Sequence, residues 1–179
     1  MKAAVFVNGV PASGKSTVAR AISTATGWPL LALDTIKEAL FEDIGPGDRD
    51  HNRMLGRASY RAIFALIAEF PADAHVVIDA WFGFQTRTIL NAHIARSGLE
   101  RIAELWCHAP PDIIGARYAA RVGERSVGHL GLDYVPELID LAKRAMPLGV
   151  YPLMEVDTTQ PTPDLAQWLE ATLSAAAKQ

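Results

Sequence analysis

The stretch Gly9-Val10-Pro11-Ala12-Ser13-Gly14-Lys15-Ser16 matches the pattern G-x-x-x-x-G-K-[ST], the phosphate-binding loop of nucleotide-dependent enzymes. The apolar run over residues 3–7 precedes the loop and predicts a buried strand. A helix is expected to begin at Ser16, because Val18, Ile22 and Ala25 then share one apolar face. Strand, loop and helix thus follow in the order that the motif requires, which argues against a chance glycine turn.

This loop supplies most of the candidate nucleotide-binding residues. The backbone N–H groups of such a loop, together with the helix N-terminus, form a concave site for polyphosphate. We expect Gly9 and Gly14 to adopt backbone angles that a side chain would forbid. Lys15 is expected to reach the β- and γ-phosphates as a catalytic residue, and Ser16 to hold Mg²⁺. The full predicted set is Gly9, Val10, Pro11, Ala12, Ser13, Gly14, Lys15, Ser16 and Thr17.

Outside the loop, apolar runs alternate with helical segments. Strands are predicted at residues 30–33, 75–79, 101–108 and 153–157, and helices at 35–41, 52–70, 85–97, 112–125, 136–145 and 163–176. Because the strands are continuously apolar, the pattern indicates a three-layer α/β sandwich with a parallel sheet between helices. Ligands bind such sheets beyond the C-terminal strand ends. Residues 1–179 are predicted to form one domain, with a mobile, glycine-marked lid at about residues 121–135.

The composition argues against several function classes. The formal net charge of −3 gives no electrostatic footprint for nucleic-acid binding. No signal peptide is recognised and no apolar stretch is long enough to span a bilayer, so we expect a cytoplasmic protein without a membrane partner. Cys107, the single cysteine, lies in an apolar run and is expected to be a buried, inert thiol. The five histidines show no metal-ligand spacing.

Three acidic residues follow predicted strands and are candidates for chemistry. Asp34 ends the second strand, where a carboxylate can accept the proton of an acceptor hydroxyl; the alternative is a helix N-cap. Asp79 ends the third strand and is expected either to assist Mg²⁺ or to contact the acceptor, the alternative being a cap or turn residue. Asp157 ends the fifth strand and is assigned to the side of the nucleotide base.

Two stripes of arginine recur at every fourth residue. On the first stripe, Arg121 and Arg125 could reach the transferred phosphate when a lid closes, and Arg121 could also bind the nucleotide; a solvated basic face is the alternative. Arg117, earlier in that helix, is expected to be solvated. The second stripe is also expected to be solvated, with an acceptor contact as the alternative; it comprises Arg53, Arg57 and Arg61.

Aromatic side chains follow Asp79 directly. Trp81, Phe82 and Phe84 could form the wall of a pocket for an apolar or ring-bearing acceptor. We expect at least one of them to pack beneath the loop instead.

Several of these segments resemble a known family. The phosphate loop, Leu33-Asp34-Thr35-Ile36-Lys37 and Val76-Val77-Ile78-Asp79-Ala80 with Arg87 resemble P-loop kinases of small molecules with the nucleoside-monophosphate-kinase fold. That group includes shikimate kinases, gluconate kinases and zeta-toxin-like kinases. The chain is most similar to the chloramphenicol phosphotransferases, through Trp28-Pro29-Leu30-Leu31-Ala32-Leu33 with the helix after it, and through Val156-Asp157-Thr158-Thr159. Residues 42–57 and 80–84 depart from that pattern.

The resemblance implies a five-stranded parallel sheet in the order 2-3-1-4-5. It also implies ATP and Mg²⁺ as cofactors, Asp34 as the base for an acceptor hydroxyl, and Arg87 as a substrate-binding candidate. The leading hypothesis is therefore transfer of the γ-phosphate of ATP to a hydroxyl of a small molecule, with chloramphenicol or another antibiotic as the suggested acceptor. The alternatives are a toxin-like kinase of a nucleotide sugar and a non-catalytic nucleotide-binding switch. A GTPase switch is disfavoured, since no Asn-Lys-x-Asp motif occurs.

Overall fold

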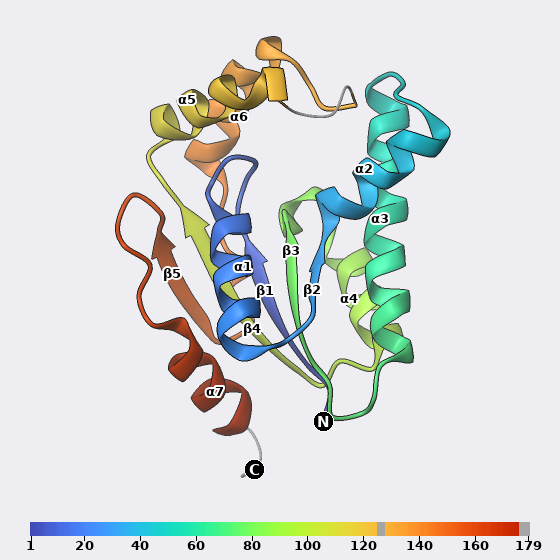
Figure 1. Cartoon of the computed structure of the whole chain (residues 1–179), viewed down its shortest axis with the longest axis vertical. Helices are drawn as coiled ribbons and strands as arrows, with labels where there is room; N and C mark the ends of the chain where they lie inside the picture. Colours follow the sequence, from blue (N-terminus) through green and yellow to red (C-terminus); the bar gives the residue numbers. More distant parts are fainter. Residues whose placement is uncertain (125–127, 176–179) are drawn as a thin grey trace.

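The computed structural model describes residues 1–124 and 128–175 of the chain. A five-stranded sheet in the order β2-β3-β1-β4-β5 lies at its centre, and every neighbouring pair of strands is parallel (Figure 1). This confirms the sheet order that the resemblance implied. The strands are β1 (Ala3–Asn8), β2 (Leu30–Ala32), β3 (His75–Ala80), β4 (Arg101–His108) and β5 (Leu153–Asp157).

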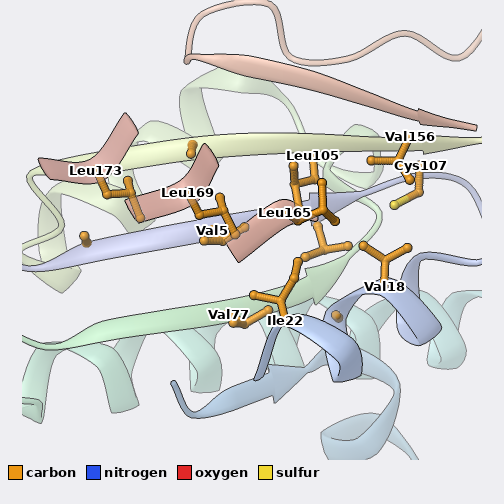
Figure 2. Close-up of a cluster of buried hydrophobic side chains, with 14 residues drawn as sticks. Val5, Val18, Ile22, Val77, Leu105, Cys107, Val156, Leu165, Leu169 and Leu173 are labelled. Carbon is orange, nitrogen blue, oxygen red and sulfur yellow. The ribbon is translucent and has the colours of Figure 1, made fainter. Parts of the chain in front are cut away.

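Helices cover both faces of this sheet, as the continuous apolar strands predict. Successive side chains of β1 point to opposite faces. Val5 packs with α1 and α7 (Figure 2), whereas Phe6 packs with α3 and α4 on the other face. Figure 1 shows these helices on the two sides of the sheet. A third apolar cluster joins α5 and α6 to Val10 of the phosphate loop. The helices are α1 (Lys15–Thr26), α2 (Leu33–Ile44), α3 (Arg49–Glu69), α4 (Arg87–Ser97), α5 (Pro111–Arg121), α6 (Val135–Arg144) and α7 (Leu165–Ala175).

Several predicted boundaries differ from the structure around the carboxyl edge of the sheet. Strand β2 ends at Ala32, so Asp34 lies in the first turn of α2 rather than at a strand end. Helix α3 begins at Arg49, because the side chain of Asp48 caps it by accepting from the backbone N–H of His51 at 2.8 Å. The loop predicted over residues 42–50 is therefore reduced to residues 45–48. Helix α5 has Pro110, not the predicted Asp112, at its N-cap position.

The described part of the predicted lid comprises two 3₁₀ turns, Val122–Glu124 and Leu132–Tyr134, and the start of α6. Two polar contacts join it to α2 and α3: Asn52 with the carbonyl of Gly128, and Glu38 with His129. Glu137, in the first turn of α6 just after the lid, adds a contact with Arg49. Motion of this segment stays a prediction. None of the described helices is both long and apolar enough to cross a membrane.

Candidate nucleotide and acceptor site

The phosphate loop connects β1 to α1 in the conformation expected of such a motif. Gly9 has φ +156° and Gly14 has φ +89°, which confirms the predicted need for glycine. A β-carbon on Gly9 would lie 2.5 Å from the carbonyl oxygen of Cys107, and one on Gly14 would lie 2.9 Å from the Cβ of Thr158. The neighbouring strand and the turn after β5 thus fix the close approach of this loop.

Two further features of the loop suit a bound anion. Ala12 has φ +63°, an uncommon conformation for a residue with a side chain, and such strain persists mainly at functional sites. Lys15 is only 9% exposed and has no hydrogen bond or ion pair with any described residue. Because an unpaired buried ammonium is costly, its position fits a phosphate ligand. These two observations support the predicted nucleotide role of the loop.

Asp79 lies beside the start of this loop. It pairs in register with Val7 of β1, two residues before Gly9, and is 5% exposed. Its buried Oδ1 atom has no hydrogen-bond partner among the described residues. Mg²⁺ in nucleotide sites takes one or two protein oxygens, substrate phosphates and several waters, so Asp79 and the hydroxyl of Ser16 fit that ion. Which of them contacts the metal stays a prediction.

A cavity of about 370 Å³ opens at this edge of the sheet. It brings together Lys15, Asp34 and Asp79, which three different elements supply. Between the phosphate loop and the lid, its wall is made by Pro11, Leu33, Lys37, Arg49, Asn52, Arg53, Gly56, Ala80, Trp81, Gly83, Phe84, Tyr118, His129, Leu130, Tyr134 and Glu137. The two acids predicted from strand ends and the predicted phosphate-binding lysine therefore share one cavity.

Asp34 is not the N-cap of α2, because Ala32 occupies that position. A carboxylate in the first turn is favoured by the helix dipole. Tyr60 of α3 lies within electrostatic reach of Asp34 and Asp79. Burial raises the pKa of Tyr60 well above the usual range, and the charges of these two carboxylates raise it further. The Tyr60 hydroxyl donates to the carbonyl of Trp81, which ties α3 to the loop after β3. Tyr60 is not among the residues predicted from the sequence.

The three predicted aromatic residues separate into two groups. Trp81 and Phe84 line the cavity. Phe82 is 2% exposed and stacks on Phe6, with ring centroids 4.2 Å apart. Phe82 thus packs beneath the loop and does not contribute to the cavity wall, contrary to its prediction as a substrate-binding residue. The expectation that at least one aromatic residue packs there is confirmed.

Arg87 and Arg121, two of the predicted site residues, do not line the cavity. Arg87 donates to the carbonyl of Leu148 at 2.5 Å, so it fastens the chain after α6 instead of lining the acceptor cavity as predicted. Arg121 is exposed, and its Nε donates to the carbonyl of Arg117 at 3.4 Å. The phosphate role of Arg121 stays a prediction, and Arg125 lies outside the described residues.

Arg117, on the same stripe, contacts the phosphate-loop region through Thr158. It donates to Oγ1 of Thr158 at 2.9 Å and to its carbonyl at 3.0 Å, so the predicted solvated position is wrong. The Thr158 hydroxyl in turn donates to the carbonyl of Ser13 at 2.7 Å.

Asp157 accepts from the hydroxyl and the backbone N–H of Thr159, and these hydrogen bonds lower the pKa of Asp157. Its assignment to the nucleotide base stays a prediction.

A buried polar network behind the site was not predicted. Glu104 in β4 is fully buried and accepts from Nδ2 of Asn8 at 2.7 Å and from the backbone N–H of Leu148 at 2.8 Å. The Oδ1 of Asn8 accepts from the backbone N–H of Phe82 at 3.0 Å. Asn8 thus links the start of the phosphate loop to the loop after β3. The signal in the sequence is a glutamate inside an apolar strand.

The fold is similar to those of several solved structures that are named as kinases. A presumed kinase from Chloroflexus aurantiacus J-10-fl is 24% identical with a TM-score of 0.77, and 96% of this chain and 98% of that chain are covered. A gluconokinase from Sinorhizobium meliloti 1021 is 21% identical with a TM-score of 0.62, covering 98% and 94%. A shikimate kinase from Acinetobacter baumannii in complex with shikimate is 18% identical with a TM-score of 0.58, covering 99% and 95%.

These identities are low, and the likeness to solved structures shows the fold alone. No curated protein matches the sequence. The profile of a family described as "AAA domain" matches residues 5–132, which include the phosphate loop, Asp34, Asp79 and most of the cavity wall. Since this match spans well over half of the chain, the protein belongs to the AAA domain family.

Proposed function

We propose that the protein is an ATP- and Mg²⁺-dependent kinase that transfers the γ-phosphate to a hydroxyl of a small molecule. The observation that carries this proposal is the shared cavity, in which Asp34 and Asp79 lie with the lysine of a phosphate-binding loop. The kinase folds of the similar solved structures support the same class, and two of them are named for small-molecule substrates.

Phosphoryl transfer needs positioning and charge neutralisation more than covalent chemistry. The loop amides and Lys15 would hold the phosphates, while Ser16 and Asp79 would hold Mg²⁺, which neutralises phosphate charge when bound. The acceptor oxygen would form a bond to the γ-phosphorus as the bond from that phosphorus to the β–γ bridging oxygen breaks. Asp34 would accept the hydroxyl proton, and ADP would leave.

A carboxylate such as Asp34 inside the cavity favours catalysis over a non-catalytic switch, because a switch needs no base beside its phosphates. Trp81 and Phe84 would offer flat apolar contacts to the carbon skeleton of the acceptor. Chloramphenicol, suggested by the resemblance, is one acceptor with a ring and hydroxyl groups, and it belongs in the test panel.

The test is acceptor-dependent ATP turnover, with the phosphorylated product identified by mass. Asp34→Asn should fold and bind ATP like the wild type, but transfer phosphate about 100-fold or more slowly. Asp43→Asn is the matched control, since Asp43 lies on the exposed surface of the same helix and outside the cavity. Lys15→Ala should lose turnover together with ATP affinity. Normal turnover by Asp34→Asn would remove that residue from the base role.

A further inference from the structure

The cavity wall carries more positive charge than phosphate binding requires. Besides Lys15, three cations of α2 and α3 line it: Lys37, Arg49 and Arg53. The described carboxylates that line it are Asp34, Asp79 and Glu137. The proposed function already engages Asp34 for the proton and Asp79 for Mg²⁺.

The ion pairs of the two arginines differ in their partners. Arg49 forms an ion pair with Glu137 of α6, and the two side chains are 49% and 46% exposed, so this pair spans the roof of the cavity. Arg53 forms its ion pair with Asp50, three residues earlier on its own helix, at 3.3 Å. Asp50 is 89% exposed and does not line the cavity. An exposed pair of this kind contributes about 0–1 kcal/mol, so Arg53 can exchange Asp50 for a ligand at little cost.

Lys37 adds a second cation from α2. Its Nζ lies 5.3 Å from the centre of the Phe41 ring, and it belongs to the same helix as Asp34, three residues further along. Residues at this spacing lie on the same side of a helix. A cation thus stands beside the proposed base, on the side where an acceptor would bind.

The apolar part of the wall is fixed in place. The ring of Phe84 stacks parallel to that of Tyr60, with centroids 6.1 Å apart, and a β-carbon on Gly56 would approach it to 3.3 Å. Gly56 therefore lets Phe84 lie close against α3, one helical turn beyond Arg53. A carbon skeleton against Phe84 would have the guanidinium of Arg53 within the same wall.

We propose that the acceptor is an anionic hydroxylated molecule, whose carboxylate or phosphate group is bound by Arg53 and Lys37 while its hydroxyl faces Asp34. Arginine suits this role because its guanidinium pairs bidentately with either group. This inference rests on the proposed function. It also selects within that function, because chloramphenicol and other acceptors without an acidic group become poor substrates.

The experiment compares acceptors that differ in their acidic group. Gluconate is paired with glucitol, glycerate with glycerol, and glucose 6-phosphate with glucose; chloramphenicol is a further neutral compound. For each compound, ATP turnover is measured, and binding is measured by calorimetry in the presence of a non-hydrolysable ATP analogue. The variants are Arg53→Gln and Arg57→Gln. Arg57 is the matched control, since it is exposed on the same helix and does not line the cavity.

We expect an anionic compound to bind and to turn over better than its neutral partner. Arg53→Gln should raise the KM for that compound about 10- to 100-fold, the loss of a charge-assisted contact, with the KM for ATP unchanged. Arg57→Gln should behave as the wild type. The carboxylate and phosphate pairs separate the two kinds of anionic group.

The results also separate this inference from the proposed function. If an anionic compound binds the wild type but not Arg53→Gln, and yet no phosphate is transferred, the anion site stands and the kinase assignment fails. If neutral compounds bind as well as anionic ones, if no anionic compound binds, or if Arg53→Gln keeps the wild-type KM, the anion inference is overturned.

Discussion

Replacement of Glu104 tests whether the buried network behind the site holds the fold together. Its carboxylate receives two donors, the side-chain amide of Asn8 and the backbone N–H of Leu148. Glu104→Leu would leave the buried side-chain donor of Asn8 and the partly buried backbone donor of Leu148 without an acceptor. At about 1–3 kcal/mol for each donor, the free energy of unfolding should fall by roughly 2–6 kcal/mol. Glu104→Gln keeps one acceptor oxygen but brings a new donor into the network, so a loss of about 1–3 kcal/mol is expected.

Urea unfolding followed by circular dichroism measures these losses. With a slope of about 2 kcal/mol per molar urea, Glu104→Leu should lower the midpoint by about 1–3 M. The matched control is Glu155→Leu on the neighbouring strand β5, where the side chain is 65% exposed; its midpoint should shift by less than about 0.3 M. An unchanged midpoint for Glu104→Leu, or a Gln variant less stable than the Leu variant, would refute the reasoning, because it would show that apolar packing can replace this network.

Three further predictions follow from single contacts. Gly14→Ala should weaken ATP binding, measured by calorimetry, more than 10-fold, because its β-carbon would lie 2.9 Å from the side chain of Thr158. Gly27→Ala is the control: Gly27 has φ +72° and open space around it, so this variant should lose about 1–2 kcal/mol of stability and bind ATP as the wild type does. Burial raises the pKa of Cys107 from 9.0 to about 12, so the thiol should resist iodoacetamide until urea unfolds the chain. The contribution of the buried thiol to stability is present below about pH 9 and is lost as the pH rises toward 12. Tyr60→Phe should cost about 0.5–1.5 kcal/mol in urea unfolding, since the carbonyl of Trp81 loses the Tyr60 donor and keeps the backbone N–H of Phe84. It should also raise the KM of the acceptor; an unchanged KM would separate Tyr60 from the acceptor wall.

Features set by the strands were predictable from the sequence. Continuous apolar runs predict a parallel sheet, and parallel strands bring their carboxyl ends to one edge. Asp79 and the phosphate loop are therefore expected to lie together, and the structure confirms that Lys15 and Asp79 share a cavity. Asp34 was placed correctly at that edge, although it belongs to α2, because a strand end and the next helical turn lie within a few ångströms of each other.

Features set by contacts across the fold were not predictable in the same way. Arg87 follows Asp79 by eight residues, yet its guanidinium bonds to the carbonyl of Leu148, a segment far along the chain. Phe82 and Phe84 are separated by one residue, but a 3₁₀ turn sends one beneath the loop and the other into the cavity. Residue spacing predicts neither the partner of Arg87 nor the different directions of Phe82 and Phe84, so only the folded structure shows which of these residues line the cavity.

The two arginine stripes show what periodicity leaves undetermined. A four-residue spacing predicts that Arg53 and Arg57 share a face of α3, but consecutive members are about 6 Å apart along the helix axis. Helix α3 leads down to the start of β3, so its first turns lie nearest the carboxyl edge of the sheet (Figure 1). Arg53 therefore reaches the cavity, whereas Arg57 does not.

The same rule applies to α5, which starts three residues after β4 ends at the carboxyl edge. Arg117, one turn closer to the start of α5 than Arg121, is the residue that bonds to Thr158 beside the phosphate loop. The expectation that Arg117 is solvated because it lies early in the helix is therefore wrong. In a parallel α/β fold, the arginine nearest the N-terminus of its helix is the better ligand candidate, because the helix begins where the ligand binds.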